Sequence, residues 1–275
     1  MTRSELSYVS AVTSFHRALQ DILSAIEKTE RASVRERATT TMVLQITVER
    51  DYTIDDSKTD AYTVHVESHR ILTVFTRSDL IATKWLKQAL KSSLTKTTVL
   101  VGVWAETDYP WGYRRNEDVP YDILCLNIGS QSLIYGFPHD RDKPARFLLS
   151  FFQDPRVFAV GHGMAELSRK LKLHHRIQIR NAVDVNNLAV KGLKRDDLDL
   201  GRFGLDRLAK AVLGKRMDVF RPEEEVEWYV EDSWSLRSQK VKFCTVDIYL
   251  CFLIGLELID AIDGAAGPKK KKKNK

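Results

Sequence analysis

The chain has 275 residues, of which 43% are hydrophobic and 29% charged, so it can bury one substantial core. Its most apolar stretch, Ile248 to Ile259, is shorter than the ~20 residues that span a bilayer and contains Glu257, so we expect no membrane segment. The N-terminus lacks the basic-then-apolar order of a signal peptide, which predicts a protein of the nucleus or the cytoplasm.

The net charge of +6 is concentrated at one end of the chain. The last nine residues, "GPKKKKKNK", hold six lysines, which account for the whole of this charge and leave the rest of the chain neutral in sum. Such a run cannot pack into a core, so we predict a disordered tail over residues 263–275. The tail could bind phosphate, act as a nuclear address or keep the chain soluble.

The first part of the chain predicts a helix that is separate from the main domain. Residues 4–28 place apolar side chains at helical spacing, namely Leu6, Val9, Val12, Phe15, Leu19, Ile22 and Ile26. This amphipathic helix could pack on the main domain or on a protein partner. A polar, aperiodic linker follows it, so residues 1–39 form the first predicted unit.

Strands come next in chain order. Residues 42–50 and 62–76 show the alternation of strands, and we expect residues 51–60 between them to form a loop. A helix is predicted over residues 78–92, because Ser78 is a good N-cap and apolar residues follow at helical spacing.

The second half of the chain predicts three more strands and then alternating strands and helices. The strands are residues 97–106, 122–129 and 132–137, with a tight hairpin turn before the last of them. After these we expect a helix at 144–154, a buried strand at 156–163, helices at 164–175 and 204–217, a strand or turn leading into a helix at 181–192, and a last helix at 235–262. This order predicts one α/β domain, residues 40–262, with a mixed sheet and helices on its faces.

Two groups of side chains have ordinary explanations. The three cysteines, Cys125, Cys244 and Cys251, lie in apolar segments without zinc-ligand spacing, which predicts buried reduced thiols. His174 and His175 point about 100° apart if helical, which favours solvation or helix capping over a metal site with His162. Basic residues near them could contact phosphates or form ordinary helix surface: Arg169, Lys170, Lys172, Arg176, Lys215 and Arg216.

Several phrases occur in an order that resembles one family. They are "YTVHVESHRILTVFT", "VLVGVWAETDYP", "ILCLNIGSQSLIYGF", "FLLSFFQDPRVFAVGHGMAELSRKL", "AVDVNNLA" and "GLDRLAKAVLGKRM…LRSQKVKFCTVDIYLCFLIG". Together they resemble the Werner-type 3′–5′ exonuclease domain of the DEDD superfamily, in particular its plant branch, over roughly residues 62–260. The resemblance implies a ribonuclease-H-like fold, with antiparallel strands first and parallel strands after them.

The resemblance also implies a two-metal site. In the family, four carboxylates hold two divalent metals, Mg²⁺ or Mn²⁺, and a tyrosine orients the attacking water. Oxygen ligands suit these cations, and the acids balance their charge.

At the first acidic motif the family has Asp-x-Glu, with both side chains on one face of a strand. Aligned without a gap, Trp104 takes the aspartate position and Glu106 the glutamate position. Indole has no anionic oxygen, so Trp104 cannot bind a cation and would fill its space. A slip of two residues would instead pair Glu106 with Asp108.

At the second and third motifs the pattern also departs from the family. The second aspartate corresponds to Leu167, with Glu166 as a substitute only through a one-residue deletion. The third motif, a tyrosine and an aspartate four residues apart, is represented by Phe243 and Asp247. A phenyl ring keeps the packing but cannot orient water.

Three functions follow as hypotheses. The first is a catalytically impaired exonuclease-like protein that binds nucleic acid or a protein partner; it keeps Glu106 and Asp247 as the only metal-binding candidates in register and needs no cofactor. The second is an active Mg²⁺- or Mn²⁺-dependent 3′–5′ exonuclease that adds Asp108 or Glu166 to this pair. The third is an interaction scaffold that uses residues 4–28. The candidate nucleic-acid-binding residues are those of the tail: Lys269, Lys270, Lys271, Lys272, Lys273 and Lys275.

Overall fold

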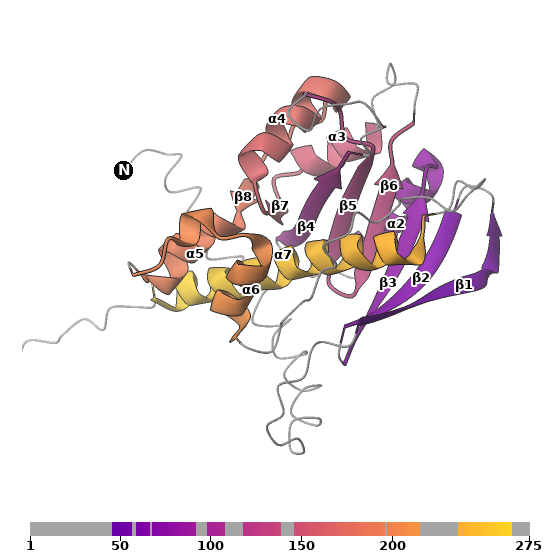
Figure 1. The fold of residues 1–275 in the computed structure, drawn as a ribbon. Helices are drawn as coiled ribbons and strands as arrows, with labels where there is room; N and C mark the ends of the chain where they lie inside the picture. Colours follow the sequence, from indigo (N-terminus) through magenta and orange to yellow (C-terminus); the bar gives the residue numbers. More distant parts are fainter. Residues whose placement is uncertain are drawn as a thin grey trace, which may run out of the picture.

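The computed structural model describes residues 46–56, 59–66, 68–91, 98–107, 118–138, 146–195, 197–214 and 236–265. These residues build one eight-stranded mixed sheet with helices on both faces (Figure 1). The strands are β1 (Ile46–Asp56), β2 (Thr59–Val66), β3 (His69–Thr76), β4 (Val99–Glu106), β5 (Ile123–Ile128), β6 (Gln131–Gly136), β7 (Val157–Gly161) and β8 (Ala182–Asp184).

The sheet has the order β1-β2-β3-β6-β5-β4-β7-β8. β1, β2 and β3 form an antiparallel meander, and β4, β5 and β6 form another. The two meanders join through parallel pairing of β3 with β6, and β7 and β8 extend the sheet in parallel beyond β4. The arrangement therefore has antiparallel strands first and parallel strands after them, as predicted.

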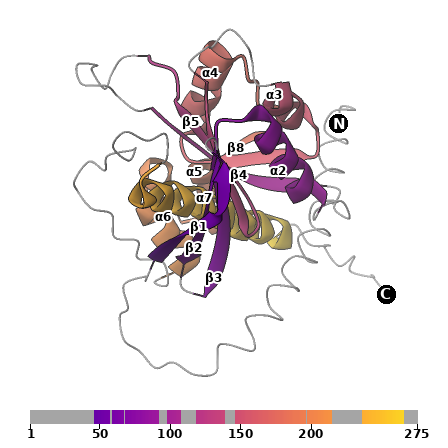
Figure 2. The ribbon, with the colours of Figure 1, turned by 90° about the vertical axis from the view of Figure 1, so that its right-hand side faces the viewer.

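The helices form two groups on opposite sides of the strands (Figure 2). The long α7 crosses one face together with α5, η1 and α6, whereas α2, α3 and α4 cover the other face. Their bounds are α2 (Asp79–Lys91), α3 (Arg146–Gln153), α4 (Met164–His175), α5 (Val185–Leu193), η1 (Leu200–Arg202), α6 (Leu205–Leu213) and α7 (Ser238–Ala265). Among the described helices, none is long and apolar enough to cross a membrane.

The central strand β4 contributes to both cores, because successive side chains of a strand point to opposite faces. Leu100 packs in the α7 core, whereas Val101 and Val103 pack in the α2–α4 core. Between them, Gly102 lets α7 approach closely, since a Cβ there would lie 2.4 Å from the carbonyl oxygen of Ile248. This contact fixes the position of α7 over the end of β4.

The predicted loop over residues 51–60 is wrong. β1 continues to Asp56, and β2 already begins at Thr59. Polar residues are tolerated here because β1 is an edge strand, and their backbone groups pair with β2. An ion pair between Arg50 and the buried Asp60 compensates the charge within this hairpin.

Candidate functional site

The candidate site lies where β4 ends against the first turns of α7. Leu100, Gly102, Trp104 and Glu106 share one face of β4 by their alternate spacing, and Leu100 and Trp104 pack in the α7 core. Trp104 and Glu106 therefore leave the strand on the same side, as the resemblance requires of its first acidic pair.

Glu106 is held by three side chains from the strand and the helix. Lys240 of α7 forms an ion pair with one carboxylate oxygen, Oε2. The other oxygen, Oε1, accepts a hydrogen bond of 2.9 Å from Nε1 of Trp104, and Sγ of Cys244 donates to it at 3.8 Å. The side chains of Lys240 and Glu106 are 9% and 24% exposed, so the pair is largely shielded from water.

The ion pair keeps Lys240 charged in spite of its burial. Burial on its own lowers the pKa of Lys240, but the neighbouring Cys244 and Glu106 raise it. The net effect is a pKa above the ordinary value, so Lys240 is a cation at neutral pH. In an active exonuclease, two dications would balance the negative charge of the site. Here Lys240 balances the charge of Glu106.

All three cysteines are buried and free, as predicted. Cys125 on β5 lies opposite Trp104 in the β4–β5 pairing, and burial together with a hydrogen bond to Cys244 raises the pKa of its thiol well above the usual value. The Cys125 thiol therefore stays protonated beside Cys244.

The predicted residues of the third motif lie further along α7. Asp247 is 2% exposed and follows Lys240 by seven residues, or two helical turns, so the two lie on nearly the same side of the helix. Phe243 is half-buried, and its ring centre lies 6.0 Å from Nζ of Lys242. The helix thus presents a lysine, a thiol and a carboxylate in succession toward the sheet.

The second motif is directed away from Glu106. Leu167 is buried in the α2–α4 core, which lies on the other face of the sheet. Glu166 is exposed and forms an ion pair of 2.7 Å with Arg169, one turn later on α4. Neither side chain joins Glu106 and Lys240 in the described structure.

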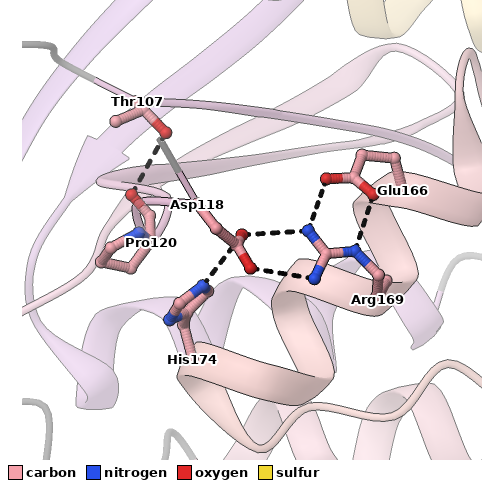
Figure 3. Close-up of polar contacts among 6 residues, drawn as sticks. All are labelled: Thr107, Asp118, Pro120, Glu166, Arg169 and His174. Atoms are coloured by element: carbon pink, nitrogen blue, oxygen red, sulfur yellow. Dashed lines mark hydrogen bonds and ion pairs between the residues drawn. The ribbon is translucent and has the colours of Figure 1, made fainter. Parts of the chain in front are cut away.

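Glu166 belongs instead to a polar network on α4 (Figure 3). Arg169 also donates to both carboxylate oxygens of Asp118, at 2.9 and 3.0 Å, and His174 contacts the same carboxylate at 3.2 Å. The hydrogen bond from Arg169 is the largest cause that lowers the pKa of Asp118, to about 2. The network fastens the segment that precedes β5 to α4.

Other predicted site residues lie outside the described residues. They are Asp108, the amphipathic segment at residues 4–28, and the tail lysines Lys269–Lys273 and Lys275. The alternative pairing of Glu106 with Asp108 therefore stays a prediction.

Reasoning from the sequence missed Lys240 and considered His162 only as a metal ligand. Lys240 could have been found from its spacing of seven residues before Asp247 on a helix. His162 directly follows β7, and its ring centre lies 6.4 Å from that of Trp104. Its position at the end of the strand next to β4 is the signal that could have identified it.

The described residues do not fit a two-metal site. Within the described residues, no three histidine, cysteine or acidic side chains are grouped so that they could hold a metal ion. The carboxylate of Glu106 is already paired with Lys240, and it accepts a hydrogen bond from Trp104.

Solved structures that resemble the chain include the following two. Escherichia coli RNase D, an exoribonuclease involved in structured RNA processing, matches with a TM-score of 0.54 at 12% identity, over 70% of this chain and 45% of its own. The catalytic core of RRP6 from Trypanosoma brucei matches with a TM-score of 0.51 at 14% identity, over 70% of this chain and 48% of its own. This chain thus spans about half the length of either match. No protein-family model and no curated protein matches the sequence.

These matches show the fold. The chain has a ribonuclease-H-like fold, which confirms the predicted fold class.

Proposed function

We propose that the protein is a catalytically impaired 3′–5′ exonuclease-like protein that binds nucleic acid, with degenerate motifs of the plant branch of the Werner-type family. The observation that carries the proposal is the ion pair between Lys240 and Glu106, with Trp104 bonded to the same carboxylate. We further propose that the protein acts in the nucleus or the cytoplasm.

The ion pair opposes the chemistry of an exonuclease in two ways. A dication that approached Glu106 would meet the positive charge of Lys240, which has to leave a mostly buried position first. The indole of Trp104 also fills the space beside the carboxylate and supplies a donor where a metal needs an oxygen ligand. With Leu167 packed in the opposite core, the second motif supplies no acid beside Glu106 among the described residues.

Binding of nucleic acid is supported by the fold and by the tail. The chain resembles an exoribonuclease in fold, and its six tail lysines can follow a phosphate backbone without a folded groove. Because the body is neutral in sum, we expect this binding to be indifferent to base sequence and to weaken with salt.

The experiment is a degradation assay with the purified full-length protein on 3′-tailed DNA and RNA, with Mg²⁺ and with Mn²⁺. We expect no shortening above background with either metal, while a gel-shift assay on the same strands shows a complex. Shortening that disappears in Asp247→Ala would overturn the proposed loss of activity. If no strand binds at low salt, the nucleic-acid part of the proposal fails, and a scaffold that uses residues 4–28 takes its place.

A gain-of-function variant tests the same cause from the other side. Trp104→Asp alone should not restore degradation, because Lys240 still neutralises Glu106 and metal sites fail as units. Restored degradation by this single variant would show that the lysine does not block the site.

A further inference from the structure

Four planar side chains gather beside the candidate site, and they come from four parts of the fold. Trp104 on β4 and His162 after β7 have ring centres 6.4 Å apart at an interplanar angle of 32°. Phe203, after η1, lies under the guanidinium of Arg207 of α6, whose Cζ is 5.6 Å from the ring centre. A hydrogen bond of 3.1 Å between His162 and the carbonyl oxygen of Phe203 joins the two pairs.

Hydrogen bonds to the buried Asn186 hold the backbone at Phe203 in place. The buried Asn186 donates to the carbonyl oxygens of Leu200 and Phe203, at 2.7 and 2.9 Å, so the turn that carries Phe203 is fixed to α5. Since a carbonyl oxygen only accepts, Nε2 of His162 is the donor in its bond to Phe203, which fixes the tautomer and orientation of that ring. The positions of His162 and Phe203 are therefore fixed by the protein itself, without a ligand.

The surface above these side chains is open. Trp104, His162 and Phe203 are only half-buried, and Arg207 is exposed. Two exposed glycines adjoin them, Gly163 after His162 and Gly204 after Phe203, and a Cβ at either would meet no atom within 4 Å. The backbone beside His162 and Phe203 is therefore uncovered at these two glycines.

The charge of the neighbourhood suits an anionic ligand with planar groups. Glu106 bonds to Trp104, but Lys240 cancels its charge, so the indole does not carry an uncompensated carboxylate. Arg207 adds an exposed positive charge at the other pair. Bases of single strands stack on aromatic rings and on arginine guanidinium planes, and their phosphates attract arginine.

We propose that the pairs Trp104–His162 and Phe203–Arg207 form a stacking site for unpaired bases of single-stranded nucleic acid. The inference rests on the proposed function and names the ligand of the same site. It gives the tryptophan a role: the residue at the lost acid position supplies a ring in place of a metal ligand.

The test compares two strands and two variants of the full-length protein. The two probes are a fluorescent single strand of about 12 uridines and the same strand with abasic sugars in place of the uridines. Their length is within the range that single-strand binding sites cover. Phe203→Leu removes one ring of the site. Phe147→Leu is the matched control, because Phe147 is a partly buried ring in the α2–α4 core on the opposite face. Thermal melting of each variant checks that it is folded.

If bases stack at this site, the wild type binds the uridine strand about 5- to 150-fold more tightly than the abasic strand. Phe203→Leu should lose most of this difference with an unchanged salt slope, and Phe147→Leu should keep it. Arg207→Gln should lower the salt slope by about 0.7, the share of one phosphate on a single strand. If the wild type binds but Phe203→Leu still prefers the uridine strand as strongly as Phe147→Leu, the stacking site is refuted and the proposed function stands. If the wild type binds neither strand, both proposals fail together.

Discussion

At the scale of single residues, the most informative charge is that of Lys240. A lysine that is 9% exposed loses most of its hydration, and it stays charged because Glu106 lies opposite it. Truncating one member of such a pair leaves the other as an uncompensated, largely buried charge, which costs more than the pair itself contributes. A variant that removes one member of the pair therefore has a larger effect on stability than the net contribution of the intact pair.

We predict that Lys240→Met lowers the free energy of unfolding by about 1–3 kcal/mol, less than for a fully buried pair because Glu106 is partly exposed. The double variant Glu106→Gln with Lys240→Met should recover most of this loss, since it leaves no unpaired charge. Urea denaturation measures both. Lys84→Met is the control, because Lys84 is exposed on α2, on the opposite face. Equal effects of Lys240→Met and Lys84→Met would contradict the argument.

A second prediction concerns Asp118. Its pKa of about 2 is set mainly by the hydrogen bond from Arg169, so Arg169→Gln should raise it toward the ordinary value of 3.8. Because the folded-state pKa is lowered, the contribution of Asp118 to stability is present above pH ~4 and is lost as the pH falls toward 2. The carboxyl ¹³C shift of Asp118, followed by NMR against pH, measures this pKa. Asp154 serves as an internal control, because its pKa is lowered by Arg156 instead and should not move.

At the scale of elements, the packing of α7 on the sheet depends on two glycines. Gly102 lies under the backbone of α7 at Ile248, and Gly255 of α7 lies over Val160 of β7. The first contact meets a backbone carbonyl, which cannot move without shifting the helix, whereas the second meets side-chain methyl groups. The two glycines therefore differ in how much they tolerate a methyl group.

We predict that Gly102→Ala costs about 1–3 kcal/mol of unfolding free energy, the usual effect of overpacking, and that Gly255→Ala costs less. The reason is that the new Cβ would lie 2.4 Å from the oxygen of Ile248 at Gly102, against 2.7 Å from a methyl group of Val160 at Gly255. Gly201→Ala is the control, because its Cβ would meet only an ordinary contact at 3.9 Å. Chemical denaturation ranks the three, and a tolerated Gly102→Ala would show that α7 can shift along β4.

The elements also show which structure could be predicted from the sequence. Helix α4 has the predicted bounds, because its apolar positions at Met164, Leu167 and Leu171 repeat at helical spacing. The far end of β1 was missed, since its acidic residues resemble a loop and its strand conformation depends on backbone pairing with β2. The periodicity of apolar side chains indicates the structure of one element at a time, whereas the extent of an edge strand depends on its pairing with the neighbouring strand.

At the scale of the whole molecule, the site depends on contacts between distant parts of the chain. The sequence located Glu106 on β4 and Asp247 on α7, but the Glu106–Lys240 pair joins residues 134 positions apart. The alignment of Leu167 with the second acidic position likewise gave no indication that its side chain packs in the opposite core. Local spacing fixes which face of an element a residue occupies, whereas the packing of α7 decides what that face meets.

The last prediction concerns the positive charge of the C-terminal lysine tail. The six tail lysines lie outside the described residues, and they account for the whole net charge of +6. Each phosphate that a lysine neutralises releases condensed counterions. If all six lysines engage duplex DNA, the logarithm of affinity should fall against the logarithm of salt with a slope near about −5, and less steeply on single strands.

Deleting residues 268–275 should therefore remove most of the salt-dependent affinity and leave the fold intact. A salt titration of full-length and truncated protein on the same labelled oligonucleotide measures the difference. Stacking on Trp104 and Phe203 should survive the deletion, because base contacts release few counterions, and it should appear as a residual, nearly salt-independent preference for unpaired bases. Equal slopes for the two proteins would assign the electrostatic binding to the body and leave the tail with solubility or targeting.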